Sequence, residues 1–171
     1  ISVAWNPFAG APIVHNITVY RDGEVIDVLK TSSFEILRRE DQLEAAQLTG
    51  ILTAVLRVPD LRVGDELEIE LTSFSSDPTL GGNETGFLLL QPSPSPGRYR
   101  LGLSWGDGRK PNLKMTPDLA SAVRESGRSL ELQFDNPSPV SPPNGAPPRY
   151  KWQRVIEFSH FSDWAAVSRH F

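Results

Sequence analysis

The sequence predicts a mainly β protein: an antiparallel β-sandwich of about eight to ten short strands with a short C-terminal helix. Apolar and polar residues alternate along most of the chain, with the period of two that places successive side chains on opposite faces of a strand. Fifteen prolines and thirteen glycines gather between these alternating runs, where such residues end strands and form turns. Short strands with turn signals every 8–12 residues are typical of a sandwich or barrel.

The first half of the chain contains the clearest hairpin signal. Residues 13–29 alternate and are interrupted at Asp22 and Gly23, two residue types that tolerate the positive φ angles of a two-residue hairpin turn. Runs at 51–58 and 66–74 follow, separated by a Pro-Asp break and a Val-Gly-Asp turn. In the second run apolar residues alternate with glutamates, so we expect a strand with one face in water.

Four more alternating runs predict strands in the second half of the chain, at residues 85–91, 98–105, 128–134 and 150–158. Proline-rich segments at 92–97 and 136–148 separate them. The second segment is interpreted as a long loop rather than an interdomain linker, because the residues that follow it are too few to form another core.

Helix signals are few. Residues 39–48 are rich in helix formers but have no cap and no apolar stripe. In residues 116–127, Thr116 and Pro117 favour the start of a short helix, whereas the pair Ser126 and Gly127 could equally turn a hairpin into the next strand.

The C-terminal segment is predicted to be helical. Trp164, Val167 and Phe171 stand at i, i+3 and i+7, with Ser162 or Asp163 as the cap. A helix this short is marginal without a partner, so its apolar stripe should meet another surface. We expect residues 155–158 to close the sheet, Phe161 and Trp164 to dock on the sandwich, and Phe171 to stay exposed.

These predictions place a β-sandwich domain at residues 1–158 and a C-terminal segment or helix at 159–171. The apolar residues of this segment need a partner surface and are the candidate interface residues: Phe161, Trp164, Val167 and Phe171.

Composition excludes several classes of function. Seventeen basic and twenty-one acidic residues give a net charge of −4, which argues against binding to nucleic acid or to anionic lipid. The absence of cysteine removes disulfides, thiolate metal sites and thiol catalysis. No apolar run approaches the roughly 20 residues of a membrane helix. The chain begins at Ile1 with no leader, which suggests a processed protein or a fragment that has lost any signal peptide.

One motif suggests a hydrolase. Residues 102–106 read Gly-Leu-Ser-Trp-Gly and match the Gly-x-Ser-x-Gly pattern of the nucleophile elbow, in which a strand enters and a helix leaves the serine. Here a Gly-Asp-Gly turn follows. We therefore interpret Ser104 as the end of a strand at a hairpin, not as a nucleophile.

Other reactive residues do not form a convincing site. The sequence Ser-His-Phe-Ser-Asp-Trp at 159–164 contains the residue types of a triad, but triads are assembled by the fold from separate segments. The glutamates at 66, 68 and 70 are more typical of a solvated strand face than of a glycosidase pair. We predict no catalytic residue, no metal site and no cofactor. The tryptophans at 5, 105, 152 and 164 are more often core residues than ligand platforms.

Several longer stretches together resemble a known family. They lie at residues 15–29, 37–40, 48–71, 77–82 and 155–171. In this order they resemble the N-terminal domain of unknown function that precedes a transglutaminase-like, papain-related domain in many bacterial proteins. The Arg-Asp-Gly hairpin, the Leu-Arg-Val-Gly-Asp turn and the closing segment contribute most of the similarity, whereas 83–150 matches loosely and Ile1 begins inside the family pattern.

The resemblance implies a non-catalytic β-sandwich in a secreted or periplasmic, sometimes membrane-attached, parent protein. The catalytic Cys-His-Asp would belong to the downstream transglutaminase-like domain, so no functional residue transfers to this chain. The expected role is an accessory domain that positions the downstream domain or binds its substrate or partner, with a protein or glycan as ligand. The alternative is a free-standing carbohydrate- or peptide-binding β-sandwich module.

Overall fold

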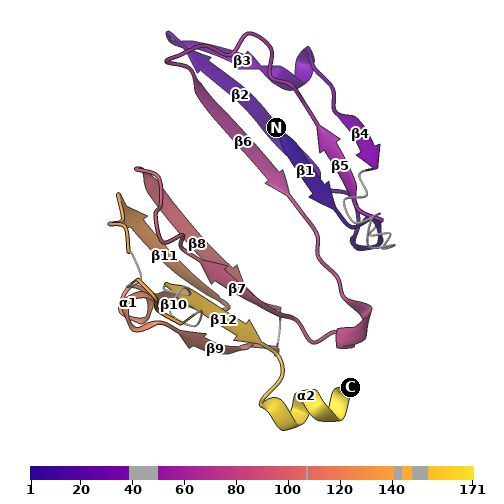
Figure 1. Ribbon diagram of the computed structural model, residues 1–171, viewed down its shortest axis with the longest axis vertical. Coiled ribbons are helices and arrows are strands. Elements are labelled where there is room, and N and C mark those ends of the chain that lie inside the picture. The colour runs from indigo at the N-terminus through magenta and orange to yellow at the C-terminus, as the bar shows by residue number, and fades with distance from the viewer. Residues whose placement is uncertain (39–49, 107, 141–143, 148–153) are drawn as a thin grey trace. The chain divides into compact units, whose positions relative to one another are not determined.

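The computed structural model describes residues 1–38, 50–106, 108–140, 144–147 and 154–171. These residues form a mainly β protein with twelve strands in four three-stranded antiparallel sheets and a short C-terminal helix (Figure 1). The predicted fold class is therefore confirmed. The strands divide between two compact units, Ile1–Pro78 and Thr79–Phe171, and each unit contains two of the sheets.

The structure has more strands than the eight to ten expected. The additional ones are only three or four residues long, too short for alternation to be recognised in the sequence. They are β1 (Ser2–Trp5), β4 (Glu35–Arg38), β9 (Asn112–Met115) and β10 (Arg124–Ser126).

The first unit is built around the strand β2 (Ile13–Arg21), which lies between β3 (Glu24–Asp27) and β6 (Glu66–Thr72). Its second sheet has the order β1-β5-β4, with β5 at Leu52–Val55. The core residues of the unit are Ile17, Val19, Val28 and Leu56. Asp22 and Gly23 have φ angles of 49° and 86°, as the predicted hairpin turn requires.

Strand β6 has its glutamates in water, as predicted, but its apolar face is covered only in part. Leu67 packs against the core, whereas Ile69 and Leu71 are exposed. The reason is position: β6 is the edge strand of its sheet, and the core of the unit reaches it only near its first residues.

An ion pair joins the β2–β3 hairpin to the turn before β6. Arg21 and Asp65 lie one position beyond Tyr20 and Glu66, the last pair of the β2–β6 ladder. The Arg21 Nε and Nη2 atoms donate to the two Asp65 carboxylate oxygens at 2.9 and 2.7 Å. The Arg62 backbone N–H donates to the same carboxylate at 2.8 Å. The Asp65 side chain is only 3 % exposed, and these hydrogen bonds, that from Arg21 first, lower its pKa to about 2.

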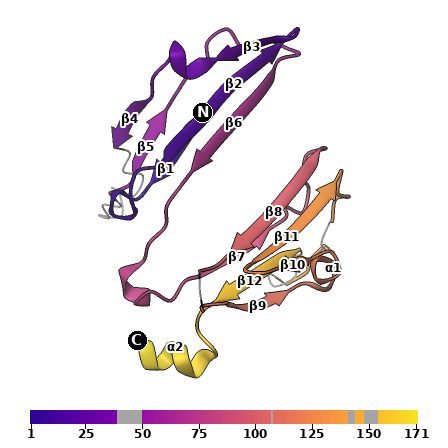
Figure 2. The same cartoon turned by 180° about the vertical axis from the view of Figure 1, so that it is seen from behind.

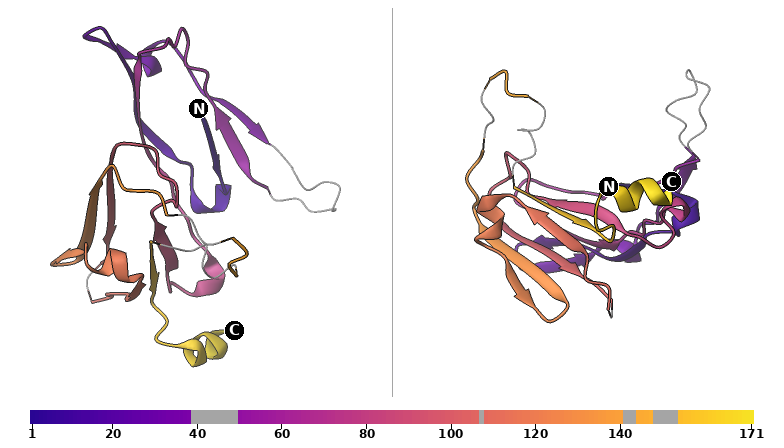
Figure 3. Two further views of the ribbon diagram at one scale, coloured as in Figure 1. Left: turned by 60° about the vertical axis from the view of Figure 1, so that its left-hand side comes forward. Right: turned by 90° about the horizontal axis from the view of Figure 1, so that it is seen from below.

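The second unit is built around the strand β12 (Val155–Ser159), which lies between β7 (Thr85–Leu89) and β9. Its other sheet has the order β10-β11-β8, with β11 at Ser129–Asp135 and β8 at Arg98–Ser104. Figures 2 and 3 show the sheets from further directions. The buried residues Leu119, Leu130, Leu132 and Ile156 form the core of this unit.

Strand β12 was expected to be the last strand at one edge of its sheet. It is instead the central strand, because it pairs with β7 on one side and with β9 on the other. Consequently Val155 and Ile156 are both buried although they are neighbours, so the expected strict alternation does not hold here.

Residues 116–127 contain both predicted structures, first a short helix and then a hairpin turn. The helix α1 (Pro117–Ala120) follows Thr116, and β10 then pairs with β11 across Gly127, whose φ is 58°. In the proline-rich segment, residues 136–140 and 144–147 form neither helix nor strand, in agreement with the predicted loop. Residues 39–48, which are rich in helix formers, lie outside the described residues.

The Arg21–Asp65 pair makes the stability of the first unit depend on pH. The folded pKa of Asp65 is about 2, below the value near 3.9 of an unfolded chain, so the stabilisation is present above pH 4 and is lost as the pH falls toward 2. We expect Asp65→Asn to lower the urea midpoint of this unit at pH 6 and to change it little at pH 2, measured from the methyl NMR signals of Ile17 and Val19.

Glu70→Gln is the matched control, because Glu70 lies on β6 opposite Asn16 and forms no ion pair among the described residues. A difference between wild type and Asp65→Asn that is the same at both pH values would contradict the assignment.

Candidate functional site

The C-terminal helix α2 (Trp164–His170) has a hydrogen-bonded N-cap. The Asp163 carboxylate accepts a hydrogen bond from the Ala166 N–H at 2.7 Å, so Asp163, and not Ser162, is the N-cap. Ser162 instead donates to Asp163. Arg169 and His170 lie in the last turn, where positive charge is favourable to the helix dipole.

The structure corrects the expectation for Trp164. Its side chain is 85 % exposed, and Phe171, which was expected to be exposed, is 75 % exposed. The helix is oriented by a different residue: His170 Nε2 donates to the Thr79 carbonyl oxygen at 2.6 Å, and the His170 ring packs edge-on against Phe161. The apolar spacing predicted the helix, but not that Val167 would be partly buried while Trp164 and Phe171 are exposed.

The contact of α2 with residues 79–82 is close. A Cβ atom at Gly81 would lie 2.9 Å from His170 Cε1, so a side chain at this position would displace the His170 ring. The Asn112 side chain donates to the Phe161 carbonyl oxygen at 3.0 Å. Phe161 and Val167 are partly buried. Trp164 and Phe171 are exposed, and the Phe171 ring packs edge-on against His170. We term these two exposed residues, seven positions apart in the sequence, the α2 aromatic surface.

Ser104 is the last residue of β8 and pairs with Ser129 of β11. No helix follows it directly, so the strand–turn–helix geometry of a nucleophile elbow is absent from this part of the chain. Strand β8 and the next strand, β9, belong to different sheets, so they do not form the hairpin expected after Ser104; Asp107 of the Gly-Asp-Gly sequence lies outside the described residues.

The histidines make structural contacts. His160 Nδ1 accepts from the Glu84 N–H and its Nε2 donates to the Arg109 carbonyl oxygen, both at 3.0 Å. His15 Nε2 lies 2.8 Å from Thr72 Oγ1. Ser159 accepts a hydrogen bond from the Phe161 N–H. Within the described ranges no group of three potential ligands is placed to hold a metal ion.

The acidic face of β6 forms hydrogen bonds with side chains of the neighbouring strand β2. Glu68 accepts from the Tyr20 hydroxyl at 2.7 Å and from Asn16 Nδ2 at 3.0 Å. The hydrogen bond to Glu68, followed by burial and the nearby negative charge, raises the pKa of Tyr20. The tryptophans differ from one another: Trp105 packs against the second core as expected, and Trp164 does not.

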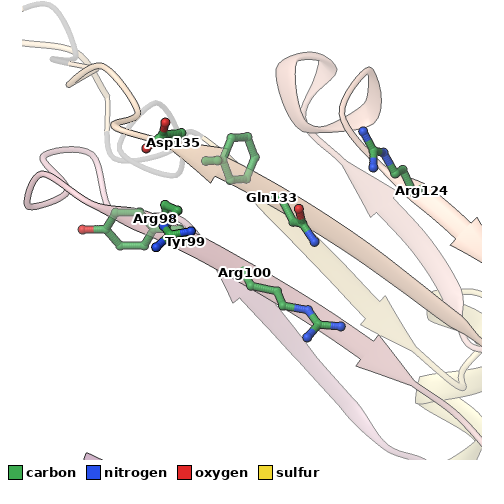
Figure 4. A pocket seen from close by; sticks show the side chains of 7 residues that line it. Arg98, Tyr99, Arg100, Arg124, Gln133 and Asp135 are labelled. Carbon is green, nitrogen blue, oxygen red and sulfur yellow. The ribbon is translucent and has the colours of Figure 1, made fainter. Parts of the chain in front are cut away.

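The sequence prediction missed a pocket on the sheet β10-β11-β8. It has a volume of about 490 Å³ and side chains from all three strands line it (Figure 4). The lining residues are Arg98, Tyr99, Arg100, Arg124, Gln133, Phe134 and Asp135. The alternation of Arg98 and Arg100 along one strand is the sequence signal that could have indicated it.

One of the three arginines has an internal partner. Arg100 donates to the Glu131 carboxylate, with its Nε at 2.8 Å, and this contact, with a further hydrogen bond from Gln133, holds the pKa of Glu131 below its usual range. Arg98 and Arg124 take part in no ion pair among the described residues. Arg98 lies opposite Asp135 and Arg124 opposite Glu131 in the sheet register, so the pocket offers two guanidinium groups that are near carboxylates but outside any ion pair of the described residues.

Comparison with known proteins agrees with the fold. The model of DUF3857, a domain of unknown function with a solved structure, matches residues 1–141. A crystal structure described as that of a putative protease from Parabacteroides distasonis is similar with a TM-score of 0.68 at 15 % identity. The match covers 98 % of this chain and 34 % of that one, so this chain spans about a third of its length. No curated protein matches the chain.

The described part of the chain contains no helix that is long and apolar enough to cross a membrane.

The exposure of Trp164 predicts a small effect of its removal from this chain. Trp164→Ala should change the free energy of unfolding by less than about 0.5 kcal/mol, as exposed substitutions usually do. Ile156→Ala, at a fully buried site, should lower it by about 2–5 kcal/mol. Denaturant melts of both variants measure the difference, and a loss above 2 kcal/mol for Trp164→Ala would show that its ring is buried in solution.

The contact between His170 and Gly81 predicts that a larger residue at position 81 weakens the attachment of α2. Gly81→Ala should loosen α2, because the new methyl group displaces the His170 ring. Gly127→Ala is the matched control, since its φ of 58° is close to the 56° of Gly81 but no atom lies within 4 Å of its Cβ position. Amide hydrogen exchange of α2 should rise in the first variant alone, and an equal rise in both would show that α2 is not held by this contact.

Proposed function

The chain belongs to the DUF3857 family of domains of unknown function, and we propose that it is a non-catalytic accessory domain of a larger bacterial protein. Its role is to hold a neighbouring domain in position, or to present a substrate or partner to it. The neighbour proposed from the sequence resemblance is a transglutaminase-like domain, and the proposed location is periplasmic or extracellular.

The observation on which the proposal rests is the α2 aromatic surface. Trp164 is 85 % exposed, and tryptophan is among the residues most enriched at the energetic centres of interfaces, because its large ring buries much area with little loss of conformational freedom. The helix that presents it is capped by Asp163 and is held to Thr79 by the His170 hydrogen bond. An anchored helix with an exposed aromatic pair is suited to receive another domain.

Two further observations support the accessory role. This chain corresponds to about a third of a solved chain that is described as a putative protease, which is consistent with a domain that works beside others. In addition, the catalytic candidates His160 and Glu68 make structural hydrogen bonds, and Ser104 pairs with Ser129 within a sheet. The chemistry is accordingly assigned to the neighbouring domain.

A second candidate function is a free-standing carbohydrate- or peptide-binding module. The pocket lined by Arg98, Arg100 and Arg124 favours it, because guanidinium groups bind carboxylates on both kinds of ligand.

The accessory role predicts that α2 is covered in the full-length gene product. Amide exchange of residues 163–171 should be slower there than in the 171-residue chain, and Trp164→Ala with Phe171→Ala should restore the faster exchange. Phe8→Ala is the control, since Phe8 is an exposed aromatic residue of the first unit. Equal exchange in both proteins, or a reading frame that encodes no further domain, would overturn the proposal.

The proposed lack of catalysis predicts that a fluorophosphonate probe does not label the chain, because among the described residues no base is hydrogen-bonded to Ser104 and no helix follows it directly. Labelling that appears in the wild type and disappears in Ser104→Ala, detected by mass spectrometry, would show that this chain is itself a hydrolase.

A further inference from the structure

Strand β8 has one free edge, and its backbone groups there can be identified. The Trp105 N–H donates to the Arg128 carbonyl oxygen and the Asn136 N–H to that of Gly97. These pairs lie at the two ends of the β8–β11 ladder. In an antiparallel ladder, hydrogen-bonded and non-hydrogen-bonded pairs alternate, so Tyr99, Leu101 and Leu103 bond to β11.

The N–H and C=O groups of the intervening residues must then point away from β11. These residues are Arg98, Arg100, Gly102 and Ser104. Within the described residues β8 has β11 as its sole paired strand. Such a row of unpaired backbone groups is a template for another strand.

The same four residues have their side chains on the exposed face of the sheet, since all four are exposed and the residues between them are partly buried. Two of them are arginines spaced about 7 Å apart along the strand. The pocket of about 490 Å³ lies on the sheet beside them, and Arg124 adds a third guanidinium group at its far side (Figure 4). Gly102 contributes no side chain and leaves the edge open at its centre.

We infer that the β8 edge binds an extended peptide with acidic residues at alternating positions, which adds to the sheet as a fourth strand. Residues directly opposite on neighbouring strands share a face of the sheet. Glutamates at every second peptide position would therefore meet Arg98 and Arg100, while the peptide backbone pairs with the outward N–H and C=O groups of β8.

Charge favours an acidic peptide over a second copy of β8 as the occupant of this edge. The chain as a whole has a net charge of −4, so an acidic peptide is attracted by the local arginines and not by the molecule at large. A second copy of β8 would place two more arginines on the same face, and like charges side by side destabilise a strand pair. This site is independent of the α2 aromatic surface and does not require the accessory role.

The test is a binding measurement with a fluorescent seven-residue peptide of alternating threonine and glutamate, followed by anisotropy. Binding should weaken as salt is added. Arg98→Glu should lower the affinity at least about tenfold, as expected for reversal of a charge in contact. Arg57→Glu, at an exposed arginine of the first unit, should leave the affinity unchanged.

Two modified peptides separate strand addition from simple charge attraction. N-methylation of the glutamate amides, which would face β8, should abolish binding, whereas N-methylation of the threonine amides, which would face away, should not. A peptide with lysine in place of glutamate should not bind.

The proposal is overturned if neither peptide N-methylation matters, if Arg98→Glu and Arg57→Glu behave alike, or if polygalacturonate competes as well as the peptide. Concentration-dependent dimerisation that Arg98→Glu alters would assign the edge to a second copy and would equally overturn it. Circular dichroism of Arg98→Glu confirms that its sheets are intact before binding is compared.

Discussion

Each unit of this protein depends on one central strand that is buried on both faces. In β2 the consecutive residues Ile17, Thr18 and Val19 are all buried, and in β12 the same is true of Val155 and Ile156. A strand with neighbours on both sides satisfies its backbone groups within the sheet, so it can lose water on both faces without leaving polar groups unpaired. The Thr18 hydroxyl follows the same rule, since it donates to the Asn16 side chain.

The Arg21–Asp65 pair shows why two short motifs far apart in the sequence belong together. Arg21 opens the Arg-Asp-Gly hairpin and Asp65 ends the Leu-Arg-Val-Gly-Asp turn, and the structure makes them direct neighbours at the end of the β2–β6 ladder. A nearly buried carboxylate is costly unless it is paired. The Arg21 guanidinium and the Arg62 N–H together pair the Asp65 carboxylate. They thereby fix the register in which β6 pairs with β2.

The sequence predicted those features that depend on local chemistry. The turn at Asp22 and Gly23, the cap at Asp163 and the strand-like character of residues 98–105 all follow from backbone preferences that neighbours scarcely alter. Features that depend on distant residues were not predictable. Trp164 was expected to be buried because its spacing is that of an apolar stripe, but the contact of His170 with Thr79, 91 positions away, decides which face of α2 is turned inward. The division into two units likewise could not be predicted from the sequence, since both halves of the chain have the same alternating pattern of apolar and polar residues.

The second unit has two exposed features that arise from different physical causes and serve different partners. The α2 aromatic surface is apolar, and a stable interface of this kind gains its free energy by removing area from water. The β8 edge offers backbone hydrogen bonds and guanidinium groups, which give direction and charge selectivity but little apolar area. The first is therefore suited to a permanent neighbour and the second to a ligand that exchanges. Because α2 follows β12 and β8 belongs to the other sheet of the unit, an occupant of one need not displace an occupant of the other.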